Sequence, residues 1–275
     1  MLKIFFIKAV YISSLISGLT LAEESQCFTA LKAYENNYQL SDGSSNEKRL
    51  VYLKSIKSIC RDNAIHVIYQ SRVLVDMRKV DDAFLILDEA IANYSLPIGN
   101  ALYEKADLMQ RIIFSGYKNH SEHKDISYKE SILLFKQALK TDTNIKPLIY
   151  AGLAEVHILI NELDEAIEYA SLGIKLDNNI ARFYSLLGII ESKKNDFLKA
   201  QHYLEISANK QGMAYLKEPD TVLALAKVFC HNKRKDLVIG LVNKALDTIP
   251  HSEDIPDLQK AYDIAKNCPH PNPMG

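Results

Sequence analysis

Residues 147–180, PLIYAGLAEVHILINELDEAIEYASLGIKLDNNI, align without a gap on residues 181–214, ARFYSLLGIIESKKNDFLKAQHYLEISANKQGMA. At the resulting offset of 34 positions, aromatic, aliphatic, amide and small residues recur in phase: Tyr150 with Tyr184, Leu153 with Leu187, Ala154 with Gly188, Asn161 with Asn195, Ala166 with Ala200, and Leu172 with Ile206. Gly and Pro are sparse in the whole chain, at 10 and 8 residues, which favours long helices over a turn-rich β fold. A fixed period of this length predicts an array of helical hairpins.

The small residues in this pattern have a steric role. Only Gly, Ala or Ser lets the two helices of a hairpin cross closely, and the aromatic and Leu positions fill the gap to the next hairpin. With these features the two segments resemble tetratricopeptide repeats, most clearly in LDEAIEYA at 163–170 and YSLLG at 184–188. They depart from the family pattern at the second-helix aromatic, the following Ala and the terminal Pro, where the chain has Ala170 and Leu204, Gly173 and Ser207, and Asn178 and Gly212. The resemblance implies an all-α, right-handed α-solenoid that binds other proteins.

Less regular repeats flank this pair on both sides. Residues 219–252 fit a further repeat after a four-residue insertion, and residues 64–97 fit one upstream. A repeat at 99–146 requires a polar segment at about 115–126 to be looped out, and Tyr103 with Asp107 offers a rival register there. We therefore predict about five hairpins, at 64–97, 99–146, 147–180, 181–214 and 219–252.

The two ends of a solenoid leave apolar faces that need capping helices. Residues 23–63 are expected to form two such helices, joined by the turn-forming linker LSDGSS at 40–45. Residues 253–268 are expected to form an amphipathic helix that covers the last hairpin. The tail at 269–275 contains three prolines and is expected to be extended.

Residues 1–22 have the pattern of a secretory signal. Lys3 and Lys8 give a basic start, residues 9–22 are nearly free of charge, and Thr20 and Ala22 are the small residues that a signal peptidase requires. We predict cleavage after Ala22, a periplasmic or secreted location, and no stable membrane insertion after cleavage. The alternative is an uncleaved anchor helix, but the residues after Lys8 span only about 21 Å of helix against about 30 Å of hydrocarbon core.

The four cysteines are an even number, which suggests two disulfides in an exported chain. Cys27 and Cys60 lie in the two N-terminal helical segments, whereas Cys230 and Cys268 lie in the last repeat and the helix after it. Of the three pairings that four cysteines allow, we favour Cys27–Cys60 and Cys230–Cys268, which would each close a loop of a few dozen residues at one end of the array. Metal binding is the competing interpretation, but no two of the cysteines form a C-x-x-C pair.

Charge and motif content exclude several functions. Lys and Arg total 33 against 34 for Asp and Glu, so no overall charge would draw the protein to nucleic acid or to an anionic membrane. The sequence contains no nucleophile elbow, phosphate-binding glycine loop or H-E-x-x-H motif, so we expect no enzyme activity and no cofactor. The insertion contains HSEHKD at His120 to Asp125, which is either a hydrated loop or a set of zinc or nickel ligands. The second interpretation makes the protein an exported carrier or sensor that binds a metal or small ligand through this loop.

The family resemblance also implies which residues would contact a partner. The concave face of such a solenoid is lined mostly by first-helix residues, which correspond here to Ile68, Arg72, Val75, Tyr103, Asp107, Arg111, Ala151, Glu155, Ile158, Ser185, Ile189, Ser192, Leu223 and Lys227. The mixture of apolar and oppositely charged side chains suits an amphipathic helix or an extended peptide. The Lys and Asn set with which chaperone adaptors of the family clamp a terminal carboxylate is missing here. We therefore predict a non-enzymatic protein–protein interaction scaffold or assembly factor of the cell envelope.

Overall fold

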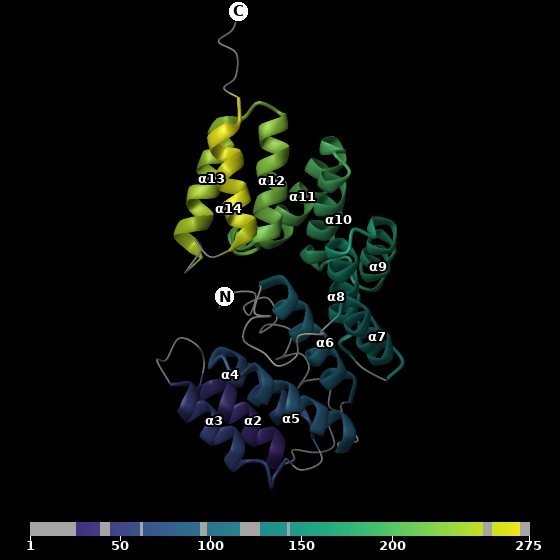
Figure 1. The fold of residues 1–275 in the computed structure, drawn as a ribbon, viewed down its shortest axis with the longest axis vertical. Helices are drawn as coiled ribbons and strands as arrows, with labels where there is room; N and C mark the ends of the chain where they lie inside the picture. Colours follow the sequence, from purple (N-terminus) through teal and green to yellow (C-terminus); the bar gives the residue numbers. More distant parts are fainter. Residues whose placement is uncertain are drawn as a thin grey trace, which may run out of the picture. The chain divides into compact units, whose positions relative to one another are not determined.

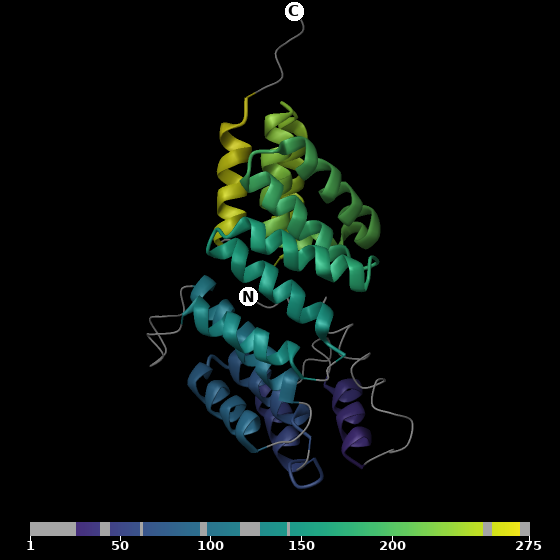
Figure 2. The ribbon, with the colours of Figure 1, turned by 90° about the vertical axis from the view of Figure 1, so that its right-hand side faces the viewer.

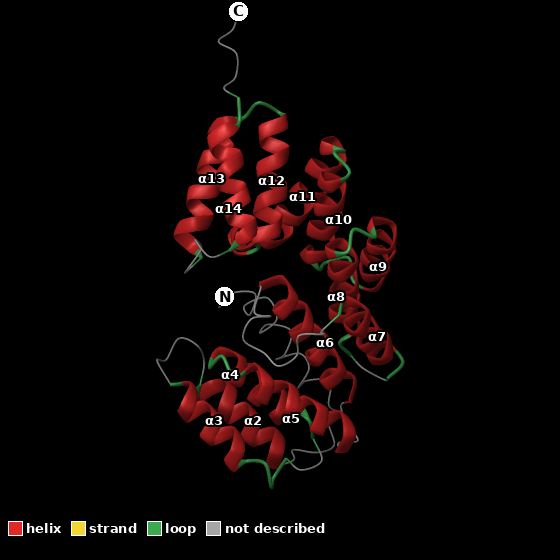
Figure 3. Cartoon of the chain, viewed as in Figure 1, coloured by secondary structure: helices red, strands yellow, loops and turns green. Residues whose placement is uncertain are grey.

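The computed structural model of the chain describes residues 26–38, 45–60, 63–93, 98–115, 127–141, 144–249 and 255–269. Within these ranges the secondary-structure elements are α-helices and one 3-10 helix, so the all-α prediction is confirmed (Figures 1 and 3). The expected signal segment, the insertion beyond Ser115 and the tail from residue 270 onward lie outside the described residues. The chain divides between Ile149 and Tyr150 into an N-terminal and a C-terminal compact unit, and each is described by itself.

The N-terminal unit is built from consecutive antiparallel helices. Its elements are α2 (Gln26–Asn37), α3 (Asn46–Ser55), α4 (Ile65–Asp76), α5 (Val80–Asn93), α6 (Ile98–Ser115) and α7 (Tyr128–Leu139). Each helix packs against the next in the chain, and α4 also packs against α6, two helices further on. The first helices of successive hairpins therefore lie side by side in this unit.

The C-terminal unit continues the same plan. Helix α8 (Lys146–Leu159) crosses the boundary between the units and is followed by α9 (Leu163–Leu176), α10 (Ala181–Lys193), α11 (Phe197–Gln211), a 3-10 helix η2 (Gly212–Lys217), α12 (Pro219–His231), α13 (Lys235–Thr248) and α14 (Pro256–Asn267). Helix α12 packs against α10, α13 and α14, and Figure 2 shows α14 in yellow beside its neighbours. Each repeat segment expected from the sequence contains one helical pair, while the exact repeat boundaries stay a prediction.

One hydrophobic core runs through the C-terminal unit. It joins side chains from every helix between α8 and α14, among them Ala154, Leu186, Val222, Val242 and Leu258. No helix in the described ranges is both long and apolar enough to cross a bilayer. The apolar residues of the core bury the helices of this unit against one another.

Side chains at the helix starts explain where several helices begin. Ser45, Ser127 and Asp196 precede α3, α7 and α11, and each accepts a hydrogen bond from the backbone N–H three residues on, at 3.1 to 3.3 Å. Such caps satisfy an amide that the helix itself leaves unpaired. Pro219 and Pro256 stand in the first turns of α12 and α14, where the missing N–H does no harm.

The turn between the two helices of a hairpin has one repeated backbone conformation. Arg78, Asn161, Asn195 and Lys233 all have a left-handed φ, of 62°, 63°, 62° and 58°. The next residue then donates its N–H to a carbonyl at the end of the first helix, as Glu162 does to His157 and Asp196 to Glu191, each at 2.9 Å. This is the C-terminal cap that glycine usually forms, in which the last carbonyl groups of the helix accept hydrogen bonds from the residues after it. Four hairpins therefore reverse direction in the same way.

Small residues lie where helices approach most closely. A β-carbon added to Gly188 would overlap the side chain of Leu204, at the crossing of α10 and α11 in one hairpin. A β-carbon on Gly173 would overlap the ring of Phe183, which α10 presents to α9. Gly188 thus allows the helix crossing that the sequence pattern predicts at that position.

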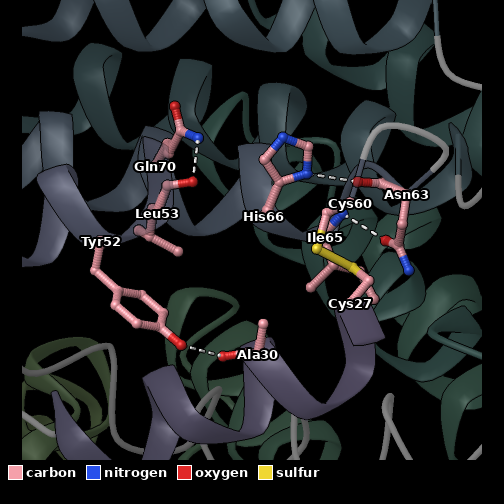
Figure 4. The surroundings of a disulfide bond; sticks show 9 residues. All are labelled: Cys27, Ala30, Tyr52, Leu53, Cys60, Asn63, Ile65, His66 and Gln70. Atoms are coloured by element: carbon pink, nitrogen blue, oxygen red, sulfur yellow. Dashed lines mark hydrogen bonds between the residues drawn. A yellow bond between two sulfur atoms is a disulfide. The ribbon is translucent and has the colours of Figure 1, made fainter. Parts of the chain in front are cut away.

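Both cysteine pairs lie at disulfide distance. Cys27 in α2 pairs with Cys60 after α3, with Cα atoms 4.9 Å apart, and Cys230 in α12 pairs with Cys268 after α14, with Cα atoms 5.5 Å apart. Figure 4 shows the first pair among its neighbours, where the Tyr52 hydroxyl donates to the Ala30 carbonyl at 3.0 Å. Each disulfide fixes a terminal helix of the described chain to the helical body next to it.

Candidate functional site

The side chains expected to contact a partner differ in exposure. Seven are buried in the structure: Ile68, Tyr103, Asp107, Ile158, Ser185, Ile189 and Ser192. The remaining ones are partly exposed: Arg72, Val75, Arg111, Ala151, Glu155, Leu223 and Lys227. Since a buried side chain offers little contact area to a partner, the second group carries the candidate site, and the assignment of the whole set to a groove stays a prediction.

In the N-terminal unit, Arg72, Asp107 and Arg111 form a charged network. It includes Glu104, a residue that is absent from the sequence-based set. Glu104 of α6 accepts two hydrogen bonds from Arg72 of α4, at 2.9 and 2.6 Å. Arg111 lies 3.6 Å from Glu104 and 3.0 Å from Asp107. Two guanidinium groups thus face two carboxylates, and the bidentate pair fixes α4 to α6.

Next to this network lies a group of stacked tyrosines. The ring of Tyr34 lies 5.2 to 6.1 Å from the rings of Tyr38, Tyr52 and Tyr69. The Tyr69 hydroxyl donates to Glu35, and burial together with that carboxylate raises the pKa of Tyr69. The phenol therefore stays neutral at physiological pH and acts as a hydrogen-bond donor that fixes α4 to α2.

A second charged network, the Arg182 cluster, occupies the C-terminal unit and consists of Arg182, Glu155, Glu218 and Asp220. The Arg182 guanidinium, in the first turn of α10, contacts Glu155 of α8 at 3.1 Å and Glu218 at 3.2 Å. It also makes two hydrogen bonds to Asp220 in the first turn of α12, at 3.2 and 2.6 Å. One arginine therefore links three successive first helices.

Glu218 is the most deeply buried member of the Arg182 cluster. Its Oε2 accepts hydrogen bonds from Ser185 at 3.1 Å and from Thr221 at 2.8 Å, besides the Arg182 contact, while its buried Oε1 has no hydrogen-bond partner. Burial raises the pKa of Glu218 above its ordinary value of 4.5. Burial acts in the same direction on Asp220, but the guanidinium of Arg182 outweighs it and lowers the pKa of that carboxyl.

The remaining predicted residues of this unit lie further along the first helices. Leu223 and Lys227 follow Asp220 on α12, and both are partly exposed. Burial and the neighbouring Lys193 lower the pKa of Lys227, whereas Asp257 of α14 acts against them. The Ser185 hydroxyl lies 2.7 Å from the Ser207 hydroxyl, which places it inside the hairpin of α10 and α11.

Four charged residues of the two networks are absent from the sequence-based set, namely Glu104, Arg182, Glu218 and Asp220. Arg182 and Asp220 lie three residues before Ser185 and Leu223, so helical spacing alone places them on the same faces. No such helical spacing points to Glu218. It ends the four-residue insertion at 215–218, part of which forms η2, and lies outside the repeat pattern.

Metal-ligating side chains are a separate question. Among the described residues, no group of three or more His, Cys, Asp or Glu side chains has an arrangement that could hold a metal ion. His157 contacts Glu162 at 2.7 Å and stacks on Tyr169, which links the helices of one hairpin. The insertion at His120 to Asp125 lies outside the described residues, so a metal site there stays a hypothesis.

Comparison with known proteins gives similarity in structure alone. No family model and no curated protein matches the chain. It is similar to PilF of Pseudomonas aeruginosa, with a TM-score of 0.58 and 17% identity over 85% of this chain and 98% of that one. It is also similar to a chain of the APC/C hetero-tetramer Cut9–Hcn1, with a TM-score of 0.65 and 14% identity over 95% of this chain and 50% of that one. YrrB, described as a TPR protein with an unusual peptide-binding site, has a TM-score of 0.44 and 14% identity over 76% of this chain and 97% of that one.

Proposed function

Since this chain has the fold of the tetratricopeptide-repeat proteins, we propose that it is a non-enzymatic scaffold that binds a segment of a partner protein along its first helices. Such proteins stack hairpins into an extended surface that suits binding better than catalysis. The same proposal makes it an assembly factor of the cell envelope. The partner segment lies against the partly exposed first-helix side chains.

The observation that carries this proposal is the Arg182 cluster. Glu155, Arg182 and Asp220 come from three successive first helices, and their side chains are 27%, 18% and 33% exposed. Hydrogen bonds hold these charged groups in place before any partner arrives, which reduces the ordering that binding requires. Leu223, one helical turn after Asp220, adds apolar surface beside the charges.

The envelope location is supported by two independent features. The expected signal at 1–22 would direct the chain out of the cytoplasm, and both disulfides suit an oxidising compartment. Expression with the native N-terminus, followed by fractionation and N-terminal sequencing, tests this part. A mature chain that begins at Glu23 in the exported fraction supports the location, whereas an intact Met1 in the cytoplasm contradicts it.

Photocrosslinking in native cells tests the binding face. A photoreactive residue at Glu155, Leu223 or Arg111 should capture a partner protein. The matched controls are Leu85 of α5 and Leu198 of α11, second-helix side chains that are 68% and 81% exposed. Capture from the control positions alone would show that the first helices are not the binding face.

A further inference from the structure

The two charged networks differ in their balance of charge. In the N-terminal unit Arg72 and Arg111 face Glu104 and Asp107, so charges of opposite sign are equal in number. In the Arg182 cluster one guanidinium faces the carboxylates of Glu155, Glu218 and Asp220. When all three are ionised the cluster has an excess of two negative charges. An uncompensated charge in a partly buried site is unfavourable, and a further cation would relieve it.

A second observation points to a missing donor. The Glu218 side chain is only 7% exposed, and its Oε1 has no hydrogen-bond partner although its Oε2 has several. Buried polar atoms are almost always paired in folded proteins, so an unpaired carboxylate oxygen marks a place where a donor belongs. The free oxygen belongs to the cluster that also has the excess negative charge.

The cluster can be approached from solvent. Asp220 and Glu155, which contact the guanidinium from α12 and α8, keep 33% and 27% of their side chains exposed. Glu218 lies deeper, at 7%. A cation that approaches Asp220 and Glu155 would meet the exposed parts of these carboxylates first.

We propose that the Arg182 cluster binds a lysine or arginine side chain of the partner protein, an inference that rests on the proposed scaffold function. Ammonium and guanidinium groups carry three and five N–H donors, and both supply the positive charge that the cluster lacks. Their hydrogen bonds to carboxylates are stronger than those between neutral groups. The partner segment is therefore basic where it crosses α10 and α12.

A purely structural role for the cluster makes a different prediction. If the three carboxylates serve only to fix α8, α10 and α12 through Arg182, then Glu218 can hold a proton and the excess charge falls. Substitutions would then change the stability of the fold, and a basic residue on a bound peptide would have no special effect. Binding measurements with peptide variants separate the two roles, because they leave the protein unchanged.

The experiment uses the full chain from Glu23 and a phage-displayed library of random peptides. Selected peptides are synthesised, and each Lys or Arg is replaced in turn by norleucine or citrulline. We expect selected peptides to be enriched in Lys or Arg, and loss of one particular basic residue to weaken binding at least about tenfold. Asp220→Asn and Glu155→Gln should weaken binding of the basic peptide by similar factors and have little further effect on its norleucine form. Glu165→Gln, an exposed carboxylate on the second helix α9, is the control and should not change binding.

The possible failures are distinguishable. Peptides that bind with equal affinity after every basic residue is replaced would overturn the inference and leave the scaffold function standing. Basic peptides that bind equally well to wild type, Asp220→Asn and Glu155→Gln would place the basic contact elsewhere and overturn it too. If no peptide is enriched on the wild-type chain, the peptide-binding function itself fails, and the inference fails with it.

Discussion

Asn161 and Asn195 lie one period apart and adopt the same left-handed backbone conformation, with φ of 63° and 62°. Asn tolerates this conformation better than most residues because its short side chain bonds locally. Arg78 and Lys233 occupy the same turn in other hairpins without that advantage. The turn therefore has the same backbone geometry in all four hairpins, but only two of the four residues are of a type that adopts a left-handed φ readily.

Replacing Lys233 by glycine should stabilise the fold, because glycine adopts a positive φ without steric cost. We expect Lys233→Gly to raise the free energy of unfolding by up to about 1 kcal/mol, measured by urea denaturation. Lys233→Ala removes the same charge but keeps the β-carbon, and it should give no such gain. Equal effects from the two substitutions would show that charge, and not backbone conformation, determines the result.

Gly188 should not tolerate even a methyl group. The added β-carbon of Gly188→Ala would overlap Leu204 at the crossing of α10 and α11, and we expect a loss of about 1 to 3 kcal/mol in unfolding free energy. Gly240 on α13 is the matched control, because a β-carbon there would meet nothing within 4 Å. Gly240→Ala should stabilise the helix by about 0.5 to 1 kcal/mol. A stable Gly188→Ala variant would mean that the two helices are not in close contact.

Glu218 should make stability depend on pH in a defined direction. Its folded pKa is raised by burial, so the folded chain holds this proton to higher pH than the unfolded chain does. The contribution of Glu218 is therefore fully present below its ordinary pKa of 4.5 and is lost as pH rises through the folded pKa. We expect the unfolding free energy of wild type relative to Glu218→Gln to fall between pH 4.5 and the folded pKa. A relative gain over that range would reverse the sign and refute the burial effect.

The two disulfides should each stabilise the chain. Their cysteines are 33 and 38 residues apart, and loops of this size correspond to about 3 to 4 kcal/mol in the chain-entropy estimate. Cys27→Ser with Cys60→Ser should lower the unfolding free energy by roughly this amount, as should Cys230→Ser with Cys268→Ser. Peptide mapping without reduction provides the direct check, since mixed pairs or free thiols would contradict both bonds.

His66 should lose its neutral form on acidification. It is buried beside the first disulfide, its Nδ1 lies 2.6 Å from the Asn63 carbonyl oxygen, and burial lowers its pKa below 6.5 (Figure 4). The unfolded chain therefore takes up the proton first, and the stability that depends on neutral His66 decreases as pH falls below 6.5. We expect His66→Gln to be less sensitive than wild type between pH 7 and pH 5, measured by thermal unfolding. An equal decrease in both proteins would exclude His66 as the cause.

The parts of the fold that depend on a period could be predicted from the sequence. Gly188 and Asn195 recur in phase with Ala154 and Asn161, and a helical crossing and a turn follow from their size and conformation alone. The cysteine pairs could be predicted as well, because each lies within one end of the array. In these cases a local feature determines the structure.

The charged networks could not be predicted in the same way. A helical period places Arg182 on a face, but its partners come from α8 and α12, and their choice depends on how far apart the hairpins lie. The period also assigned Ser185 to the binding face, whereas its hydroxyl bonds within the unit to Ser207 and Glu218. Spacing gives the direction of a side chain, and packing between repeats decides whether solvent reaches it.

The insertion at 215–218 gives the repeat array a fixed reference point. In a regular array a bound chain could shift by one repeat and find a similar surface, whereas Glu218 precedes α12 at the position that Ile180 has before α10. Among the described residues, neither α8 nor α10 has a buried carboxylate at its start. Under the proposed binding to the Arg182 cluster, a partner would therefore bind in one register only, and the four extra residues would be what distinguishes one repeat from the next.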